Sequence, residues 1–228
     1  MRRIIGLTAV LAVLLGAAPA AAQMFGDPVY VPVGVGTGVN IAGDFAMGTN
    51  DASFKTTYFG ARAAVGFGSF FASAGIGSVK ADDELVTDPQ SQTAFGGNLG
   101  YHILRLPMTP IKVTAQAGAG YIKEGEYKQL DFPIALAVGV GLPGPLGITP
   151  WVAPRLHVRS TDVGTESNTD TWFGASGGVN LSIGMIGIHL AADYINVPVP
   201  EGAPGSSSDY SPWIFGAGIN FGLNVPGM

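Results

Sequence analysis

Apolar side chains alternate with small or polar ones from residue 33 to residue 225, and this period of two constrains the fold more than any other feature. Near the start of this region, for example, Val39 and Ile41 fall on one face and Asn40 on the other. Successive side chains of a β-strand point to opposite faces, so such alternation predicts strands with one apolar face. We distinguish ten strands, at 33–45, 57–67, 70–78, 93–103, 111–121, 132–142, 148–159, 171–183, 186–195 and 213–225.

The chain is apolar overall, but it has no second apolar run long enough for a membrane helix. Mean hydropathy is +0.34 and charged residues make up only 12%, while 35 glycines and 16 prolines disfavour helices. The longest apolar run after the N-terminus, 134–142, covers nine residues and includes glycines. A transmembrane barrel faces lipid with every second residue only, so the composition predicts an all-β, closed, antiparallel transmembrane β-barrel.

The turns support the assigned phase of the strands. Gly68-Ser69 and Gly184-Met185 are two-residue connections of the Gly-X type that hairpins favour, and they require their flanking residues to share a face. Short connections also alternate with five longer polar ones, at 46–56, 79–92, 122–131, 160–170 and 196–212. Short periplasmic turns, longer outer loops and an even strand number are typical of bacterial outer-membrane barrels.

The strand at 148–159 is the least regular of the ten. Pro150 and Pro154 cannot donate ladder hydrogen bonds, so we expect a bulge or an irregular segment there. Ten strands fit the alternation of connection lengths. Eight strands remain the alternative, in case the segments 132–142 and 148–159 do not both cross the membrane.

Charged and histidine side chains of the ten segments all fall on the face opposite the apolar one, which for a membrane barrel is the lumen. A charge facing lipid at the bilayer centre costs about 2–4 kcal/mol, which explains so strict a segregation. The predicted lumen residues, structural or pore-lining, are Asp44, Arg62, His102, Lys112, Arg155, His157, Arg159, His189 and Asp193. Thirteen of the sixteen acidic residues fall instead in the five long connections, which we interpret as solvated outer surface or as a site for divalent cations that bridge to lipopolysaccharide phosphates.

The N-terminus has the layout of a secretory signal peptide. Arg2 and Arg3 precede an apolar run of twelve residues, Ile4 to Leu15, and small residues lead to a cleavage site after Ala22. The predicted organisation is a signal peptide at 1–22, a periplasmic segment at 23–32, the barrel at 33–225 and a tail at 226–228. The predicted location is the outer membrane.

Aromatic residues of the predicted strands gather at two levels, near the turn side and near the loop side, as interface girdles do. With its leader, strands and loops, the chain resembles the small outer-membrane barrels of Gram-negative bacteria, in the broad opacity-protein and OmpA-like class. The resemblance covers nearly the whole chain and rests on pattern. It implies insertion by the barrel-assembly machinery and contact with lipid and lipopolysaccharide. Members of the class typically end in an aromatic residue, whereas this chain ends in Pro226-Gly227-Met228.

Little in the sequence points to chemistry. The chain has no cysteine, its acidic balance argues against nucleic acid, and no His, Asp and Glu cluster predicts a metal or cofactor site. A regular turn after 93–103 would place His102 opposite Lys112. Ser176 lies opposite Asp193 across the Gly184-Met185 turn, and if Arg155 also meets Ser176, Arg155 and Asp193 form a structural ion pair. The alternative role for Arg155, His157 and Arg159 is an anion-attracting constriction.

We therefore expect an outer-membrane barrel that is not an enzyme and that has a structural or surface-interaction role, or allows narrow passive permeation of small solutes. Two alternatives stay open. One is an outer-membrane barrel enzyme acting on lipid A or peptides, which would need a base close to a defined nucleophile. The other is a secreted soluble β-barrel that binds a small ligand. The sequence predicts no oligomeric state.

Overall fold

The computed structural model describes residues 36–49, 54–83, 91–105, 110–124, 127–163, 166–195 and 213–223. The predicted signal peptide, the segment 23–32 and the tail 226–228 lie outside these residues. The described chain forms ten strands: β1 (Gly38–Thr49), β2 (Phe54–Phe67), β3 (Phe70–Asp83), β4 (Ser91–Arg105), β5 (Ile111–Glu124), β6 (Tyr127–Val140), β7 (Gly147–Val163), β8 (Glu166–Ile183), β9 (Ile186–Ile195) and β10 (Trp213–Leu223). No helix in the described part of the chain is long and apolar enough to cross a membrane.

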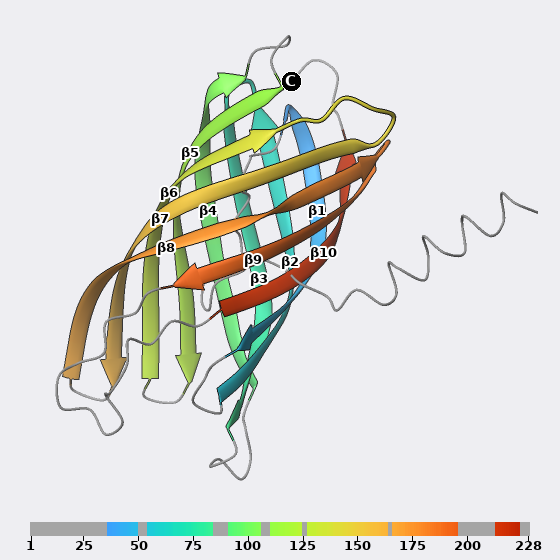
Figure 1. Ribbon diagram of the computed structural model, residues 1–228. Coiled ribbons are helices and arrows are strands. Elements are labelled where there is room, and N and C mark those ends of the chain that lie inside the picture. The colour runs from blue at the N-terminus through green and yellow to red at the C-terminus, as the bar shows by residue number, and fades with distance from the viewer. Residues whose placement is uncertain are drawn as a thin grey trace, which may run out of the picture.

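The ten strands close into a barrel in which every neighbouring pair is antiparallel (Figure 1). Consecutive strands pair along the chain, and β1 pairs with β10 from Val39↔Leu223 to Thr49↔Trp213. The predicted fold is confirmed, and the eight-stranded alternative is wrong. We call the end that carries the Gly68-Ser69 and Gly184-Met185 turns the turn end, and the opposite end the loop end.

Several strands extend farther toward the loop end than the sequence predicted. Only two residues separate β5 from β6, and two separate β7 from β8, so the long polar connections expected at 122–131 and 160–170 are mostly strand. A membrane-spanning strand needs about 9–11 residues, and β8, with 18, is much longer. Beyond the membrane, lipid no longer requires an apolar face, which is why alternation did not reveal these extensions.

Prolines interrupt the sheet without shifting its register. The β6–β7 ladder has a gap between the pairs Ala135↔Arg155 and Val138↔Val152, next to Pro154. It ends at the pair Gly139↔Trp151, before Pro150. The expected irregularity in β7 is therefore present. Pro133 has the same effect on the β5–β6 ladder, which has a gap between the pairs Ala117↔Ile134 and Gly120↔Asp131. Each gap lies on the side of the strand to which the proline nitrogen points, where it has no N–H to donate.

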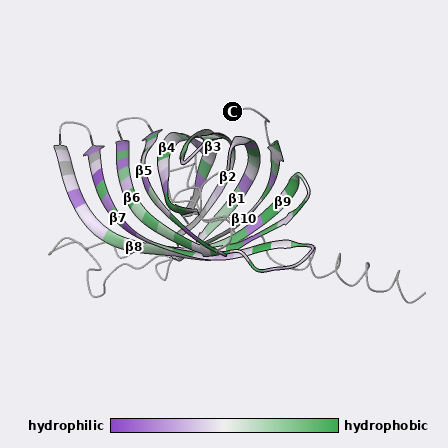
Figure 2. Ribbon diagram, turned by 90° about the horizontal axis from the view of Figure 1, so that it is seen from above, coloured by the Kyte–Doolittle hydropathy of each residue, from purple (hydrophilic) through white to green (hydrophobic). Residues whose placement is uncertain are grey.

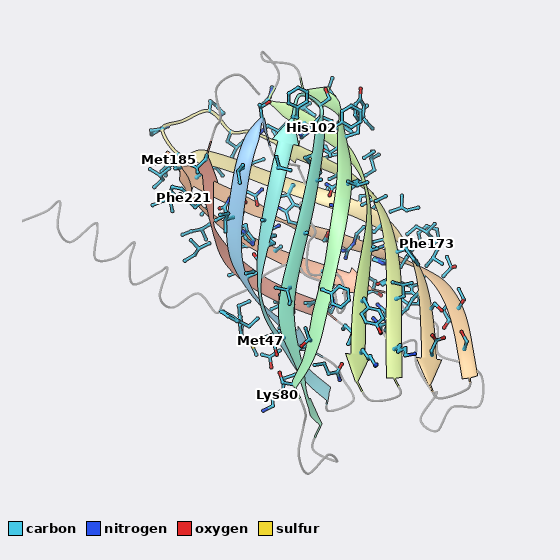
Figure 3. All side chains as sticks on the ribbon, turned by 180° about the vertical axis from the view of Figure 1, so that it is seen from behind. Met47, Lys80, His102, Phe173, Met185 and Phe221 are labelled. Atoms are coloured by element: carbon cyan, nitrogen blue, oxygen red, sulfur yellow. The ribbon has the colours of Figure 1, made fainter. Side chains whose placement is uncertain are left out.

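The outer surface of the barrel is apolar. Outward residues such as Phe59, Leu99 and Ile219 are at least 64% exposed, and each strand alternates along its length between apolar and polar residues (Figure 2). Phe173, Met185 and Phe221 project away from the wall (Figure 3). A soluble barrel would bury these side chains, so the soluble alternative does not fit the structure.

Aromatic side chains and charges mark the ends of this apolar band. Rings pair across strands at the loop end, as in Phe95–Tyr121 and Tyr194–Trp213, and at the turn end, as in Phe70–Tyr101, with centroid separations of 4.9–5.1 Å. Beyond the loop-end rings, the outward positions of the strand extensions carry charges. These residues are Lys80, Lys123, Lys128 and Asp162. Aromatic girdles followed by charges are typical of the two membrane–water interfaces.

Candidate functional site

The barrel interior holds the polar residues singled out from the sequence. The structure places all nine on the inner face, and six of them are buried. The other three are partly accessible: the side chains of Arg159 and His189 are 16% and 14% exposed, and Lys112 is half-buried. The interior groups fall into two clusters and one ion pair, together with a few neutral contacts.

The seam cluster consists of Asp44 on β1, Arg62 on β2 and His189 on β9. The two carboxylate oxygens of Asp44 are shared: Arg62 Nε lies 3.1 Å from Oδ2, and His189 Nε2 lies 2.8 Å from Oδ1. Arg62 has only donors, and its nearer Nη lies 3.2 Å from His189 Nε2. We assign a proton to His189 Nε2, which donates to Asp44, because an unprotonated Nε2 would place its lone pair against those of the carboxylate.

The seam cluster spans the point where the first and last strands meet. β10 lies between β1 and β9, and its inward residue at this level is Gly218. A Cβ atom at Gly218 would overlap both Asp44 Oδ1 and the His189 ring. Glycine is therefore required for the carboxylate and the imidazole to meet across β10. The cluster links residues 127 positions apart in the sequence across the closing strand pair.

The wall cluster consists of Asp131 on β6 with His157 and Arg159 on β7. His157 Nδ1 lies 3.4 Å from Asp131 Oδ1, and Arg159 donates to Asp131 Oδ2 at 3.0 Å. The side chains of Asp131 and His157 are fully buried. The Arg159 guanidinium lies 4.4 Å from the centroid of the Trp172 ring, a cation–π contact.

Asp131 is the residue that sequence reasoning missed, because it was assigned to an outer connection. It is a strand residue of β6 on the inner face, 0% exposed. A signal was present: Asp131 has the same phase as Pro133 and Ala135, which were on the inward side of the predicted strand. The predicted strand began at Phe132, five residues after the observed start of β6 at Tyr127.

The predicted ion pair between Arg155 and Asp193 is confirmed, and both side chains are buried. One of the two strand pairings from which this ion pair was predicted is wrong. Ser176 does pair with Asp193, but its partner on β7 is Ala153, and Arg155 lies opposite Gly174. Arginine is long enough to reach the carboxylate diagonally across the glycine.

The predicted opposition of His102 and Lys112 is wrong. The β4–β5 ladder places His102 opposite Thr114, and beyond a β-bulge between His102 and Leu104 it places Lys112 opposite Arg105. His102 Nδ1 lies 3.2 Å from the Thr114 hydroxyl. The bulge precedes a longer turn, where sequence alone does not fix the pairing.

Large rings and aliphatic side chains fill the loop-end half of the lumen. Tyr58, Trp172 and Ile214 are each at most 4% exposed, although they point inward. They form one buried cluster, the apolar layer, drawn from seven strands: Ala46, Tyr58, Val79, Ala94, Ile122, Trp172 and Ile214. The Tyr58 ring covers Gly60 and Gly77, where a Cβ atom would overlap it. Neighbouring rings therefore occupy the space that inward glycines leave.

The chemistry available to these groups is limited. Within the described ranges, no group of three or more His, Asp or Glu side chains could hold a metal ion. Asp131 orients the His157 ring as in a general-base pair, but no described hydroxyl or other group is hydrogen-bonded to His157 Nε2. The predicted acidic outer site was expected at Asp82, Asp83, Glu84, Asp88, Glu124 and Glu126. Their side chains are outside what the structure describes.

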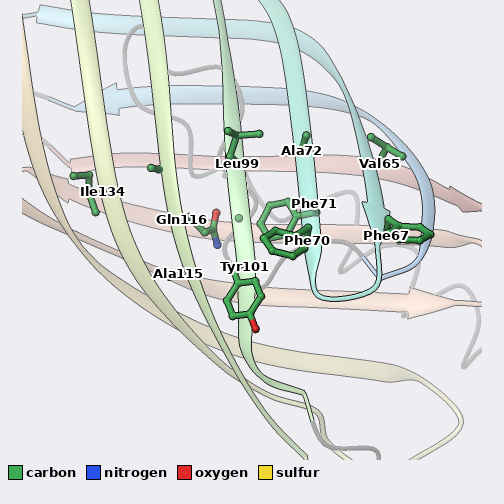
Figure 4. Close-up of a pocket in the computed structure, with 12 residues that line it drawn as sticks. Val65, Phe67, Phe70, Phe71, Ala72, Leu99, Tyr101, Ala115, Gln116 and Ile134 are labelled. Carbon is green, nitrogen blue, oxygen red and sulfur yellow. The ribbon is translucent and has the colours of Figure 1, made fainter. Parts of the chain in front are cut away.

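A groove hollows the outer surface of β2–β6 near the turn end (Figure 4). Small residues such as Ala72, Ala115 and Ala117 line it together with the larger Phe67 and Leu99. Its outward lining is almost entirely apolar, and it lies within the apolar band of the barrel. In a membrane this groove faces acyl chains.

No protein-family model and no curated protein matches the sequence. Solved structures with a similar fold include the translocator domain of the autotransporter NalP from Neisseria meningitidis, at 11% identity and a TM-score of 0.46, with 82% of this chain and 89% of that chain covered. The outer membrane protease OmpT from Escherichia coli has 10% identity and a TM-score of 0.43 over 89% of this chain and 100% of that one. LpxR from Salmonella typhimurium has 8% identity and a TM-score of 0.39 over 81% of this chain and 100% of that one. The ten-stranded closed barrel, with an apolar outside and a charged interior, is the architecture of an outer-membrane β-barrel protein.

Proposed function

We propose that this chain is an outer-membrane barrel with a closed lumen, and that its role is structural or surface-interacting rather than the passage of solutes. The observation that carries the proposal is the apolar layer, which joins buried side chains from seven strands inside the barrel. Narrow barrels are commonly filled by side chains. In the described part of the barrel, the layer and the buried ion pairs fill much of the lumen with side chains, which favours the structural role over narrow permeation.

Conductance across a planar lipid bilayer tests this proposal. We expect the folded protein to give no current steps in varied salt. A double variant, Tyr58→Ala with Trp172→Ala, removes two rings of the apolar layer and should introduce steps. The matched control is Phe59→Ala with Phe173→Ala, which removes the adjacent outward rings and should stay silent. Regular steps from the unmodified protein would overturn the closed lumen.

We also propose that the wall cluster is structural and not catalytic. Asp131 and His157 have 0% exposed side chains, so no substrate bond reaches the imidazole, and no described nucleophile is hydrogen-bonded to it. Mass spectrometry of lipopolysaccharide and of a peptide mixture after incubation with the protein checks this. We expect unchanged masses. Hydrolysis that disappears in His157→Gln would establish the enzyme alternative.

The location implies export and partners. In this proposal the leader is cleaved after Ala22, the barrel-assembly machinery inserts the strands, and the turn end faces the periplasm. Lipid and lipopolysaccharide then surround the apolar band. N-terminal sequencing of protein from isolated outer membranes should begin at Gln23. A retained N-terminus in the inner-membrane fraction would contradict it.

A further inference from the structure

Two lysines lie directly opposite each other on the outer surface of the barrel, at the loop end. Lys123 of β5 pairs with Lys128 of β6, and both side chains are exposed on the outer face. The β5–β6 ladder ends one step farther on, at Glu124↔Tyr127, and only two residues connect the strands there. Residues that flank a two-residue hairpin turn form a hydrogen-bonded pair, so the two lysines form a non-hydrogen-bonded pair. Opposite side chains are closest in pairs of this type.

Of the described residues directly opposite this lysine pair, only one is acidic. Thr93 on β4 lies opposite Lys123, and Asp162 on β7 lies opposite Lys128. Like charges directly opposite each other destabilise a sheet. One carboxylate beside two ammonium groups leaves a positive charge. The lysine pair therefore favours an anion from outside the chain.

The lysine pair lies at the border of the apolar band. Tyr121 is two residues before Lys123 on the same face of β5, and its ring pairs with Phe95 in the loop-end girdle. Leu130 has the same relation to Lys128 on β6, and it lies opposite Tyr121. Two residues of a strand span about 7 Å, so the lysines are just beyond the rings, at the depth of lipid headgroups. A ligand that contacts both the lysine pair and the band below it has an anionic head and an apolar tail.

A second copy of the chain does not supply the anion. In the part of the chain that the structure describes, the outward charges beyond the loop-end rings are Lys80, Lys123, Lys128 and Asp162. Two copies related by a twofold axis present the same surface to each other. Such a contact would bring lysines against lysines, so the anion belongs to a membrane lipid.

Two ammonium groups match a phosphate monoester better than a phosphate diester. A monoester carries about −1.5 to −2 charges at pH 7, whereas the phosphodiester of a phospholipid carries about one. Lysine binds phosphate as a point charge, which does not require the fixed geometry of a guanidinium. In the proposed orientation the loop end lies in the outer leaflet, where the lipid A part of lipopolysaccharide carries phosphate monoesters.

We propose that Lys123 and Lys128 bind a phosphate monoester of lipopolysaccharide, whose acyl chains lie against the apolar band. Both Nζ groups donate hydrogen bonds to phosphate oxygens, and no divalent cation takes part. The inference rests on the proposed surface role and orientation of the barrel, and it names the lipid class and the residues that hold it.

Native mass spectrometry of the full-length barrel, released from detergent micelles, tests the choice of lipid. The probes are bisphosphorylated lipid A, the same lipid A without its phosphates, and phosphatidylglycerol, which has a diester. We expect the barrel to retain the first lipid in preference to the other two, and to retain it equally well in EDTA. Equal retention of the three lipids, or loss of lipid A in EDTA, would overturn the proposal.

Single substitutions separate the lysine pair from general charge attraction. Lys123→Gln removes one of the two ammonium groups, so we expect roughly tenfold weaker binding of lipid A. The matched control is Lys80→Gln, at the same end of the barrel (Figure 3), because Lys80 lies opposite Ser91 and not opposite a lysine. Asp162→Asn removes the carboxylate beside Lys128 and should tighten binding. Equal losses in Lys123→Gln and Lys80→Gln would refute a specific site.

Urea unfolding gives a second readout, in which the effect of Lys123→Gln changes sign. In neutral lipid the two lysines repel each other, so the variant should have a higher urea midpoint than the unmodified protein. A ligand that binds only the folded state stabilises it, so in lipid A the variant should have the lower midpoint. The same sign in both lipids would contradict the site. These surface variants leave the lumen unchanged, so bilayer conductance tests the closed lumen separately.

Discussion

The seam cluster and the wall cluster use the same three residue types, one Asp, one Arg and one His, in different surroundings. In both, one carboxylate is shared between a guanidinium and an imidazole. The seam cluster joins three strands around the closing pair β1–β10, and its histidine is 14% exposed. The wall cluster lies on two adjacent strands, its Asp and His are fully buried, and Trp172 covers its arginine.

This difference gives the two clusters different roles. In the wall cluster the carboxylate and the imidazole are both fully buried, and only Arg159 is partly exposed, so loss of Asp131 leaves the buried His157 and the Arg159 cation without their acceptor. The seam cluster lies closer to the partly accessible turn-end lumen, near Asn40, Asn180 and Asn220, where water can replace a lost partner. We therefore expect the wall cluster to govern stability. The seam cluster should govern how the last strands meet the first.

The largest effect is expected from Asp131→Asn. It leaves Arg159 and His157 without their carboxylate under the apolar layer, and breaking a buried pair in this way costs about 3–5 kcal/mol. Urea unfolding in lipid vesicles measures the loss in the free energy of unfolding. The isosteric control is Asp44→Asn in the seam cluster. Equal losses in the two variants would remove the distinction between the clusters.

Trp172→Leu should have the next largest effect. The change keeps an apolar side chain but removes the cation–π contact with Arg159, which is worth about 2 kcal/mol when desolvated. The lost cover should also make the variant's stability more sensitive to salt. Urea unfolding at low and high ionic strength checks both points. A salt response unchanged from the unmodified protein would show that the ring does not shield the cluster.

Gly218→Ala should disturb the seam cluster alone. The added Cβ meets Asp44 and the His189 ring, so these side chains must move, at a cost of about 1 kcal/mol. Because β10 closes the barrel, we expect slower folding into vesicles, followed by the heat-dependent gel mobility of the folded form. Gly43→Ala on the neighbouring strand is the control, since a Cβ there meets nothing. Similar kinetics in the two variants would argue against a role in closure.

The smallest effect is expected from His189→Gln. Glutamine retains an N–H donor for Asp44 at a partly accessible site, so most of this hydrogen bond should persist and we expect a loss of about 0.5 kcal/mol. The matched wall variant is His157→Gln, which should cost more, because its site is fully buried. Urea midpoints of the two variants give the comparison. A larger loss for His189→Gln would reverse our assignment of the two environments.

The sequence predicted which face each strand presents, because lipid imposes a strict period of two. Where two-residue turns fix the register, as between Phe67 and Phe70, the expected neighbours are paired in the structure. The nine lumen residues could be found for the same reason, since a charge toward lipid is costly. The Arg155–Asp193 pair also followed from phase, although Arg155 lies opposite Gly174 and not opposite Ser176 as expected.

The features that were missed lie where this constraint ends. Asp131 is near the loop end, where strands leave the lipid and polar sequence no longer distinguishes strand from loop. The bulge near Leu104 precedes a longer turn, which leaves several registers open. The apolar layer was missed because Tyr58 and Trp172 look like girdle residues by type, and only their phase shows that they point inward.

Cysteine scanning along β4 tests most directly whether the apolar face meets lipid. The chain has no cysteine, so single substitutions at residues 94–101 can each carry one fluorescent label without background. Brominated lipids should quench labels at Phe95, Leu99 and Tyr101 strongly, and labels at Ala94, Asn98 and Gly100 weakly, with a period of two. Quenching in the opposite phase, or none at any position, would contradict a barrel whose apolar face meets acyl chains.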